Sequence, residues 1–328
     1  MLPKNCLLAA VDLGSNSFRV EVDRYQKGTL TRKDYIREPV RLGRGLNHEM
    51  RLDQASMERG WACLEQFGAY LRQQNVYQAR AVATQTLRQA VNRNEFIEIG
   101  QKFLGVPIEI ISGEQEALFI YTGVCALLDE AYPPAQGEQE QEKRFVIDIG
   151  GRSTELIVGQ GSQALTAYSC PVGSVGLSMD FFANERLTQP QFDQAVAYAR
   201  TLFNTAAQTM ERACGTVLVW DQAYGASGTI GAVSNVLRNN QVTDGAITRP
   251  ALDWIYEYLL RAGSITALSM PGLGDRRDVV GGGVSILLAL FDTFQDLQAL
   301  VPARGALRQG VLYDMVASAN GYASVSTR

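Results

Sequence analysis

The chain has 328 residues, of which 46% are hydrophobic and 20% are charged, and its net charge is −4. This length suits two domains, and the composition is that of an ordinary globular protein. The single histidine, His48, excludes multi-histidine metal sites, and the negative charge argues against general nucleic-acid binding. Five scattered cysteines without a CxxC pair favour the cytoplasm, and no apolar run reaches the length of about 18 residues that a membrane span needs.

The first part of the chain predicts a sheet with covering helices. Three short β-type runs open it, a long segment with apolar residues at helical spacing follows, and two more strands then alternate with two helices. In chain order, the expected elements are strands at 7–14, 17–25 and 30–43, a helix at 52–74, a strand at 79–84, a helix at 92–105, a strand at 107–112 and a helix at 113–128.

Residues 128–144 interrupt this order with two prolines, one glycine and a run of Glu and Gln. Such a composition is typical of a solvated connector, so a domain boundary is predicted there. The expected domains are 1–127 and 145–328, with the last helix packing back on the first domain.

After the connector, the opening trio of strands returns at 145–150, 153–160 and 164–173. Helical stretches follow, and the apolar run TVLVW at 216–220 predicts a strand that leads into a glycine-rich turn. The segment 297–319 is expected to end the chain as a strand and a helix.

The two halves also share a local sequence. VDLGSNSFRVEV, from Val11, aligns with IDIGGRSTELIV, from Ile147, and each stands at the first strand-turn-strand of its half. We therefore predict a duplicated α/β domain. In this alignment Asp12 falls on Asp148, Gly14 on Gly150, Asn16 on Arg152, Ser17 on Ser153 and Arg19 on Glu155.

A strand that ends in Asp and runs through a glycine-rich turn into a second strand is typical of a phosphate loop. Glycines let backbone N–H groups approach phosphate oxygens, and the acid can hold a divalent cation beside them. Two ordinary hairpins are the alternative. The expected phosphate-binding residues are Gly14, Ser15, Asn16 and Ser17 in the first turn, and Gly150, Gly151 and Ser153 in the second.

The segment GASGT, residues 225–229, is a third glycine-rich turn, placed before an apolar helix. Small residues at such a place serve either close helix packing or the approach of a phosphate. We expect Gly225, Ser227 and Gly228 to contribute to binding and not to catalysis.

Six segments of the chain resemble the signatures of the exopolyphosphatase/guanosine pentaphosphate phosphatase family, in the family's order. The resemblance implies an α/β fold with two ribonuclease-H-like domains of the actin-like ATPase superfamily around a central cleft. The segments are VDLGSNSFR (11–19), ATQTLRQAVNRNEF (83–96), IEIISGEQEA (108–117), VIDIGGRSTEL (146–156), YGASGTIGAV (224–233) and GALRQGVLYDM (305–315).

The resemblance also implies an activity, the release of terminal phosphate from inorganic polyphosphate or of the 5′ phosphate from guanosine pentaphosphate, a nucleotide of the stringent response. Glu116 matches the family's catalytic glutamate, which activates water, although its place in the first turn of a helix also suits the helix dipole alone. Arg88 matches a phosphate-contacting arginine. From its place where the chain leaves the first turn on a strand, Arg19 is either a second phosphate-binding candidate or a solvated strand residue. The expected cofactor is Mg²⁺ or Mn²⁺, held by Asp12, Asp148 and Glu155.

The chain departs from the family's pattern at three points. Arg152 stands where the family more often has a glycine, and it either binds phosphate or points to solvent. Gln115 replaces the first of two adjacent glutamates, which lowers the charge of the pocket and keeps Glu116. The chain also ends without the C-terminal helical domains of long members, so we expect lower processivity or shorter phosphate chains as substrates.

Other functions stay open at this stage. A kinase of the same superfamily would need an aspartate base and a sugar-binding segment. A non-catalytic sensor of polyphosphate, or of guanosine penta- or tetraphosphate, rests on Arg152 and Gln115 alone, and a polymerising scaffold is more remote. We expect no nucleic-acid or membrane partner, and the apolar C-terminal helix leaves a homodimer undecided.

Overall fold

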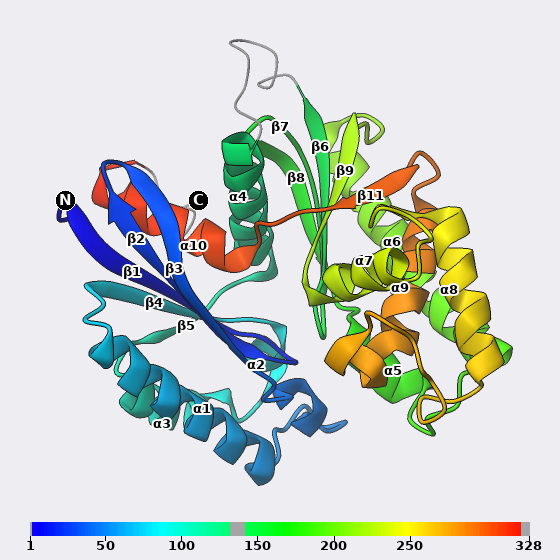
Figure 1. Cartoon of the computed structure of the whole chain (residues 1–328), viewed down its shortest axis with the longest axis horizontal. Helices are drawn as coiled ribbons and strands as arrows, with labels where there is room; N and C mark the ends of the chain where they lie inside the picture. The colour runs from blue at the N-terminus through cyan, green and yellow to red at the C-terminus, as the bar shows by residue number, and fades with distance from the viewer. Residues whose placement is uncertain (1, 132–141, 323–328) are drawn as a thin grey trace. The chain divides into compact units, whose positions relative to one another are not determined.

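The computed structural model describes residues 2–131 and 142–322 (Figure 1). The described residues up to Ala126, together with those from Gly305 onward, form one compact unit, and those of Leu127–Arg304 form a second. Most of the predicted connector, 132–141, lies outside the described residues. Its two ends belong to the helix α4 (Gly113–Ala131) and the strand β6 (Lys143–Ile149).

The first unit is built on a five-stranded sheet in the order β3-β2-β1-β4-β5. The pairs β1–β2 and β2–β3 are antiparallel, whereas β1–β4 and β4–β5 are parallel. The central strand β1 is buried over most of its length, because helices cover both faces of the sheet. The strands are β1 (Asn5–Leu13), β2 (Phe18–Gln26), β3 (Thr29–Glu38), β4 (Gln78–Ala83) and β5 (Ile108–Ile110).

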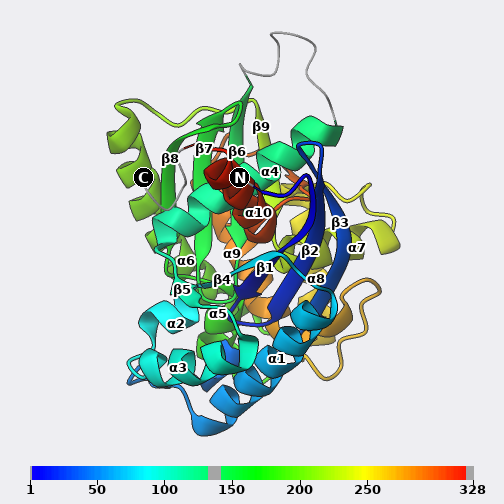
Figure 2. The same cartoon turned by 90° about the vertical axis from the view of Figure 1, so that its left-hand side faces the viewer.

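Within this unit, α1 (Gln54–Gln73) and α3 (Arg93–Leu104) lie on one face of the sheet, and α4 and α10 (Leu307–Ala319) lie on the other (Figures 1 and 2). The predicted apolar positions of α1 are its buried side, with Met57, Leu64 and Leu71 in the core. Asp53 caps this helix by accepting the N–H of Ser56 at 2.7 Å.

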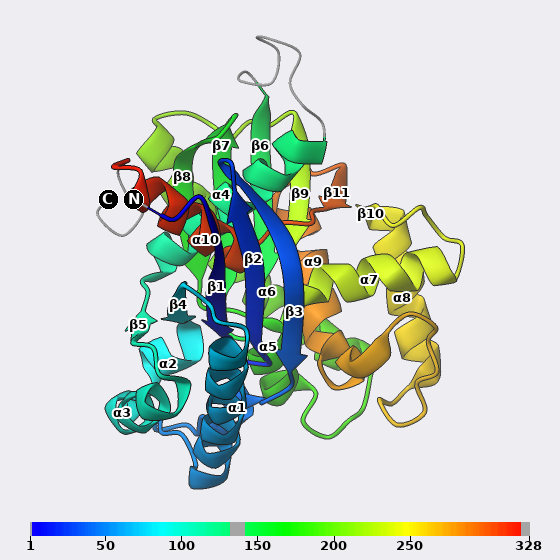
Figure 3. The ribbon, with the colours of Figure 1, turned by 60° about the vertical axis from the view of Figure 1, so that its left-hand side comes forward.

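Glycines bring α10 against α4 with no side chain between the two backbones. A Cβ at Gly310 would lie 1.8 Å from the carbonyl oxygen of Phe119, and one at Gly123 would lie 2.2 Å from that of Ala306. Figure 3 shows α10 beside β1 and β2, so this contact also places the start of α10 on the β1–β2 hairpin.

The second unit repeats the same topology. Its sheet has the order β10-β11-β9-β6-β7-β8, in which β6–β7 and β7–β8 are antiparallel and β6–β9 and β9–β11 are parallel. Five strands thus match the first unit in order and direction, which confirms the predicted duplication. The remaining strands are β7 (Thr154–Gln160), β8 (Gln163–Cys170), β9 (Gln222–Ala226), β10 (Ile247–Thr248) and β11 (Ala299–Pro302).

The core of the second unit centres on α9 (Val280–Thr293), which is buried all round, as its apolar sequence requires. It packs against α5 (Ser174–Phe181), α6 (Gln189–Cys214) and α8 (Arg249–Ala262). Gly282 lets α9 reach the start of α5, since a Cβ there would lie 2.5 Å from the carbonyl oxygen of Ser174. The helix α7 (Gly228–Asn239) follows β9.

Two of the predicted strands differ from the structure: the strand expected at 30–43 is shorter, and the strand expected at 216–220 lies later in the chain. The strand expected at 30–43 ends at Glu38, because Pro39 cannot donate a ladder hydrogen bond, and a 3₁₀ turn occupies Leu42–Gly45. A short helix, α2 (Gln85–Gln89), was not predicted.

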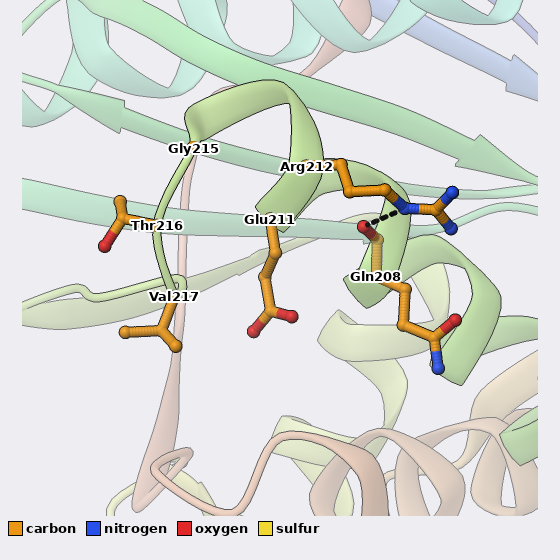
Figure 4. Close-up of a pocket in the computed structure, with 6 residues that line it drawn as sticks. All are labelled: Gln208, Glu211, Arg212, Gly215, Thr216 and Val217. Atoms are coloured by element: carbon orange, nitrogen blue, oxygen red, sulfur yellow. Dashed lines mark hydrogen bonds between the residues drawn. The ribbon is translucent and has the colours of Figure 1, made fainter.

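The apolar run 216–220 forms no strand, and Val217 is 65% exposed. The strand is β9, whose Gly225 packs closely: a Cβ there would lie 2.9 Å from Leu300. Thr216 and Val217 of this run line a pocket at the end of α6 (Figure 4). Across residues 2–131 and 142–322, every helix is too short or too polar to cross a bilayer.

Candidate active site

The first glycine-rich turn, residues 14–17, joins β1 to β2, and the pair Leu13–Phe18 closes the hairpin. Gly14 has a negative φ, so its role is close approach: a Cβ there would lie 3.0 Å from the carbonyl oxygen of Ser17. The turn therefore folds tightly back on itself.

The carbonyl groups of this turn accept hydrogen bonds from the segment that follows β3. Gly43 donates its N–H to the Ser15 carbonyl at 2.7 Å, and Arg41 donates its N–H to the Asn16 carbonyl at 2.9 Å. Within the described part of the chain, the N–H groups of Ser15 and Asn16 have no protein acceptor. The carbonyl groups of Ser15 and Asn16 are thus bound within the protein, whereas the N–H groups of these two residues are available as donors.

Asp12, at the end of β1, is buried and is bound by two arginines. Its Oδ2 accepts from Arg19 Nη1 at 3.0 Å and from Arg308 Nη1 at 3.5 Å. Arg37, on β3, donates from Nε to the hydroxyl of Ser17 at 3.2 Å. The first turn is therefore surrounded by guanidinium groups, an arrangement that suits a polyanion.

The carboxyl ends of β1, β4 and β5 lie at one edge of the sheet and bring three sequence segments together. In α2, which follows β4, Thr86 donates its hydroxyl to that of Ser15 at 2.8 Å. Two residues later, Arg88 donates from Nη1 to Glu116 Oε2, also at 2.8 Å. The helix α2 therefore connects the first turn to the predicted catalytic glutamate.

Glu116 is 6% exposed and lies in the first turn of α4. Its partner Arg88 is fixed in turn, because Nη1 also donates to the Ile111 carbonyl at 2.8 Å and Nη2 donates to Gln85 Oε1 at 2.7 Å. The sequence around Glu116 offers no cation, and the structure supplies one from 28 residues away. Arg88 thus holds the glutamate, and its predicted contact with phosphate stays a prediction.

Gln115 has a structural role that the sequence analysis missed. Its side-chain oxygen accepts the N–H of Ser112 at 2.9 Å, and its own N–H donates to the Ser112 hydroxyl at 3.1 Å. This is a capping box, and its S-x-x-Q pattern was visible at residues 112–115. Because the oxygen performs the task, either Gln or Glu fits this position.

We expect Gln115→Glu to keep both stability and activity, since Glu is the other common residue at this place in a capping box. Gln115→Ala should lower the free energy of unfolding by about 1 kcal/mol, because the Ser112 N–H loses its acceptor. Urea unfolding and phosphate-release rates of both variants would test this. A large loss of activity in Gln115→Glu with normal stability would contradict it.

The second glycine-rich turn, residues 150–153, has the geometry of the first. The pair Ile149–Thr154 closes its hairpin, and a Cβ at Gly150 would lie 3.0 Å from the carbonyl oxygen of Ser153. The start of α5 holds the carbonyl groups of this turn, since Ser174 N–H donates to the Gly150 carbonyl at 2.9 Å.

Asp148 and Glu155 are direct partners across the β6–β7 ladder and are both buried. Ser169, on β8, donates its hydroxyl to Glu155 Oε1 at 2.8 Å. Two carboxylates therefore stand side by side at the second turn. Among the described residues, no cluster of three or more Asp, Glu, His or Cys side chains is built to hold a metal ion by itself.

Arg152 lies against α5 and not in open solvent. Its Nη2 lies 3.6 Å from Met179 Sδ. Burial lowers the pKa of the guanidinium, and the negative charge of Asp180 counteracts this effect. Its φ is not positive, so the turn accepts a residue other than glycine without strain.

The third turn carries strain at Ser227, which has a φ of 105°. Its hydroxyl accepts the N–H of Ile230 and caps α7. Gly228 leaves room for a buried arginine that the sequence analysis missed, since a Cβ there would overlap the guanidinium of Arg276. Ala226 pairs with Asp148, so the second and third turns share one edge of the sheet.

The structure thus gathers the predicted residues into one group in each unit. Arg276 was overlooked because it stands in the charged run DRRD, 275–278, which is typical of a solvated turn, and Arg308 stood in a family segment without an assigned role. The first group contains Asp12, Gly14, Ser15, Asn16, Ser17, Arg19, Arg88 and Glu116, and the second contains Asp148, Gly150, Gly151, Arg152, Ser153, Glu155, Gly225, Ser227 and Gly228.

The fold and its turns define a class of α/β proteins built from a repeated unit, in which a strand with a buried Asp leads into a glycine-rich hairpin turn in each copy. Within that class, the chain belongs to the Ppx/GppA phosphatase family, whose model matches residues 22–319. It is a phosphatase by family.

Solved structures agree with this fold. A PPX-GPPA enzyme of Aquifex aeolicus is 23% identical with a TM-score of 0.73, and the match covers 94% of this chain and 99% of that one. An exopolyphosphatase of Cytophaga hutchinsonii is 21% identical with a TM-score of 0.81, over 97% and 99% of the two chains.

Proposed function

We propose that the protein is a phosphohydrolase that releases terminal orthophosphate from inorganic polyphosphate, the 5′ phosphate from guanosine pentaphosphate, or both. The observation that carries the proposal is the linkage through α2, in which Thr86 contacts the first turn and Arg88 holds Glu116. A phosphate-binding turn and a buried, oriented carboxylate are what anhydride hydrolysis needs.

In this proposal the N–H groups of the first turn bind the terminal phosphate, and Arg19 neutralises part of its charge. Glu116 accepts a proton from a water molecule as the water oxygen bonds to phosphorus. The bond from phosphorus to the bridging oxygen breaks, and the shortened chain leaves with the electrons of that bond. Arg88 keeps the Glu116 carboxylate in one orientation throughout.

The donor chemistry at the second turn fits Mg²⁺. This ion is usually held by one or two carboxylates together with water and substrate phosphates, and Asp148 and Glu155 offer such a pair. Bound there, it would neutralise phosphate charge. Asp12, also expected to hold the metal, fits less well, because its Oδ2 accepts from two guanidiniums.

The two departures that favoured a non-catalytic sensor have structural roles in this chain. Gln115 caps a helix, and Arg152 packs beside α5. Neither requires the loss of hydrolysis.

The test is phosphate release from tripolyphosphate, medium-chain polyphosphate and guanosine pentaphosphate, each with Mg²⁺ and with a chelator. Turnover of at least one substrate, dependent on Mg²⁺, supports the proposal and identifies the preferred substrate. Tight binding of all three without turnover would favour a sensor.

A further inference from the structure

Arg308, in the first turn of α10, contacts two buried acids of the β1–β2 hairpin, Asp12 and Glu21. Its Nη1 donates to Asp12 Oδ2 at 3.5 Å, and its Nε donates to Glu21 Oε2 at 3.1 Å. The guanidinium carbon also lies 5.0 Å from the centre of the Tyr35 ring. Three partners therefore fix the position of this one side chain.

The strand register explains why the two acids come together. Asp12 pairs with Arg19 across the ladder, and Glu21 stands two residues beyond Arg19, so all three side chains point to the same face of the sheet. Asp12 is 3% exposed and Glu21 is 1% exposed. Two buried carboxylates on one face repel each other unless cations stand between them.

The neighbours of these acids balance their charge. Arg32 donates to Glu21 Oε1 at 2.8 Å, and Gln309 donates to both oxygens of Glu21 at 2.6 Å. The buried Asp23 lies two residues beyond Glu21 on the same face and also attracts Arg32, so Arg19, Arg32 and Arg308 stand among three carboxylates. With no excess of either charge, the sharing of Asp12 between Arg19 and Arg308 decides how much of the Arg19 charge is left for a phosphate at the first turn.

We propose that Arg308 is a positioning residue that acts on the first turn through Asp12, an inference that rests on the proposed function. While Arg308 shares the Asp12 carboxylate, Arg19 is only partly neutralised, and its charge serves the substrate. Without Arg308, Asp12 pairs with Arg19 alone and withdraws that charge from the phosphate. Arg308 therefore controls substrate affinity without touching the substrate.

The test compares Arg308→Gln and Arg308→Lys with Arg32→Gln, a control that removes a cation from the same Glu21 without contact to Asp12. Arg308→Gln should raise KM for tripolyphosphate about tenfold and change kcat by less than about threefold. Arg308→Lys should recover part of the affinity, and Arg32→Gln should stay near wild type. A merely structural role would instead lower the thermal midpoint and the active fraction, which reduces kcat and leaves KM unchanged.

A double-mutant cycle with Asp12→Asn decides whether Arg308 acts through Asp12. The dissociation constant of tripolyphosphate is measured by calorimetry in the Glu116→Gln background, which needs no turnover. Arg308→Gln should weaken binding by less than about twofold once Asp12 is Asn, because the coupled partner is gone. An equal loss in both Asp12 backgrounds, or an equal loss in Arg32→Gln, overturns the proposal.

The two proposals fail in different ways. If wild type binds tripolyphosphate and releases no phosphate from any substrate, the hydrolase proposal fails and the calorimetric cycle still decides the role of Arg308. If wild type does not bind tripolyphosphate, the positioning proposal fails as well. Should Arg308→Gln not fold, Arg308→Lys carries the same cycle.

Discussion

Glu116→Gln is expected to lower kcat for phosphate release by at least about 100-fold, the usual contribution of a general base. The substitution is isosteric, and the Gln oxygen can still accept from Arg88, so the geometry of the first turn of α4 should survive. Substrate affinity should change little, because the carboxylate contacts the attacking water and not the bound phosphate. Steady-state kinetics and a calorimetric dissociation constant would separate these two effects.

Glu114→Gln is the matched control. Glu114 lies in the same helical turn, loses the same charge, and is exposed where Glu116 is buried. Any effect through the helix dipole would be shared by both variants, whereas an effect on water activation belongs to Glu116 alone. Comparable losses in the two variants, or a Glu116→Gln enzyme with most of its kcat, would remove Glu116 from the catalytic role.

Gly310→Ala is expected to destabilise the first unit by about 3 kcal/mol or more, at the upper end of overpacking effects. The new Cβ would lie 1.8 Å from the carbonyl oxygen of Phe119, and backbone atoms on both sides leave no flexible group to move. The unfolding transition of the first unit in urea, followed by circular dichroism, would measure the loss. Because the chain has two units, the transitions must be fitted separately.

Gly231→Ala is the contrasting variant. Gly231 lies within α7, and a Cβ there would meet no atom within 4 Å. Replacing glycine by alanine at such a helical position should stabilise by about 0.5–1 kcal/mol. A Gly310→Ala protein as stable as wild type would show that α10 can move away from α4, and the placement of Arg308 by that contact would then be in doubt.

Much of the fold was predictable because its signals are local. The aligned hairpins at Asp12 and Asp148 showed the duplication, and the matching order of two sheets confirms it. The wrong strand at 216–220 also comes from reading a local signal. Apolar residues with high β propensity predict a strand, but the place beside β6 is taken by QAYGA, whose small residues fit against Leu300 and Ile230.

The candidate site was predictable as a set of residues and not as a set of contacts. The Asp-ended strands, the glycine turns and the family segment around Glu116 marked where chemistry should occur, and their roles stay predictions. The capping box at Ser112 and Gln115 was also present in the sequence, as a local pattern over residues 112–115.

The sequence by itself determined most strands and helices of the first unit, the duplication and the positions of the glycine turns, because each depends on residues close together in the chain. Only the tertiary structure decided that Arg88 holds Glu116, that Arg276 fills the space over Gly228, and that Arg308 binds Asp12. These pairs are separated by between 28 and 296 residues, and only the packing of strands and helices brings their side chains within reach.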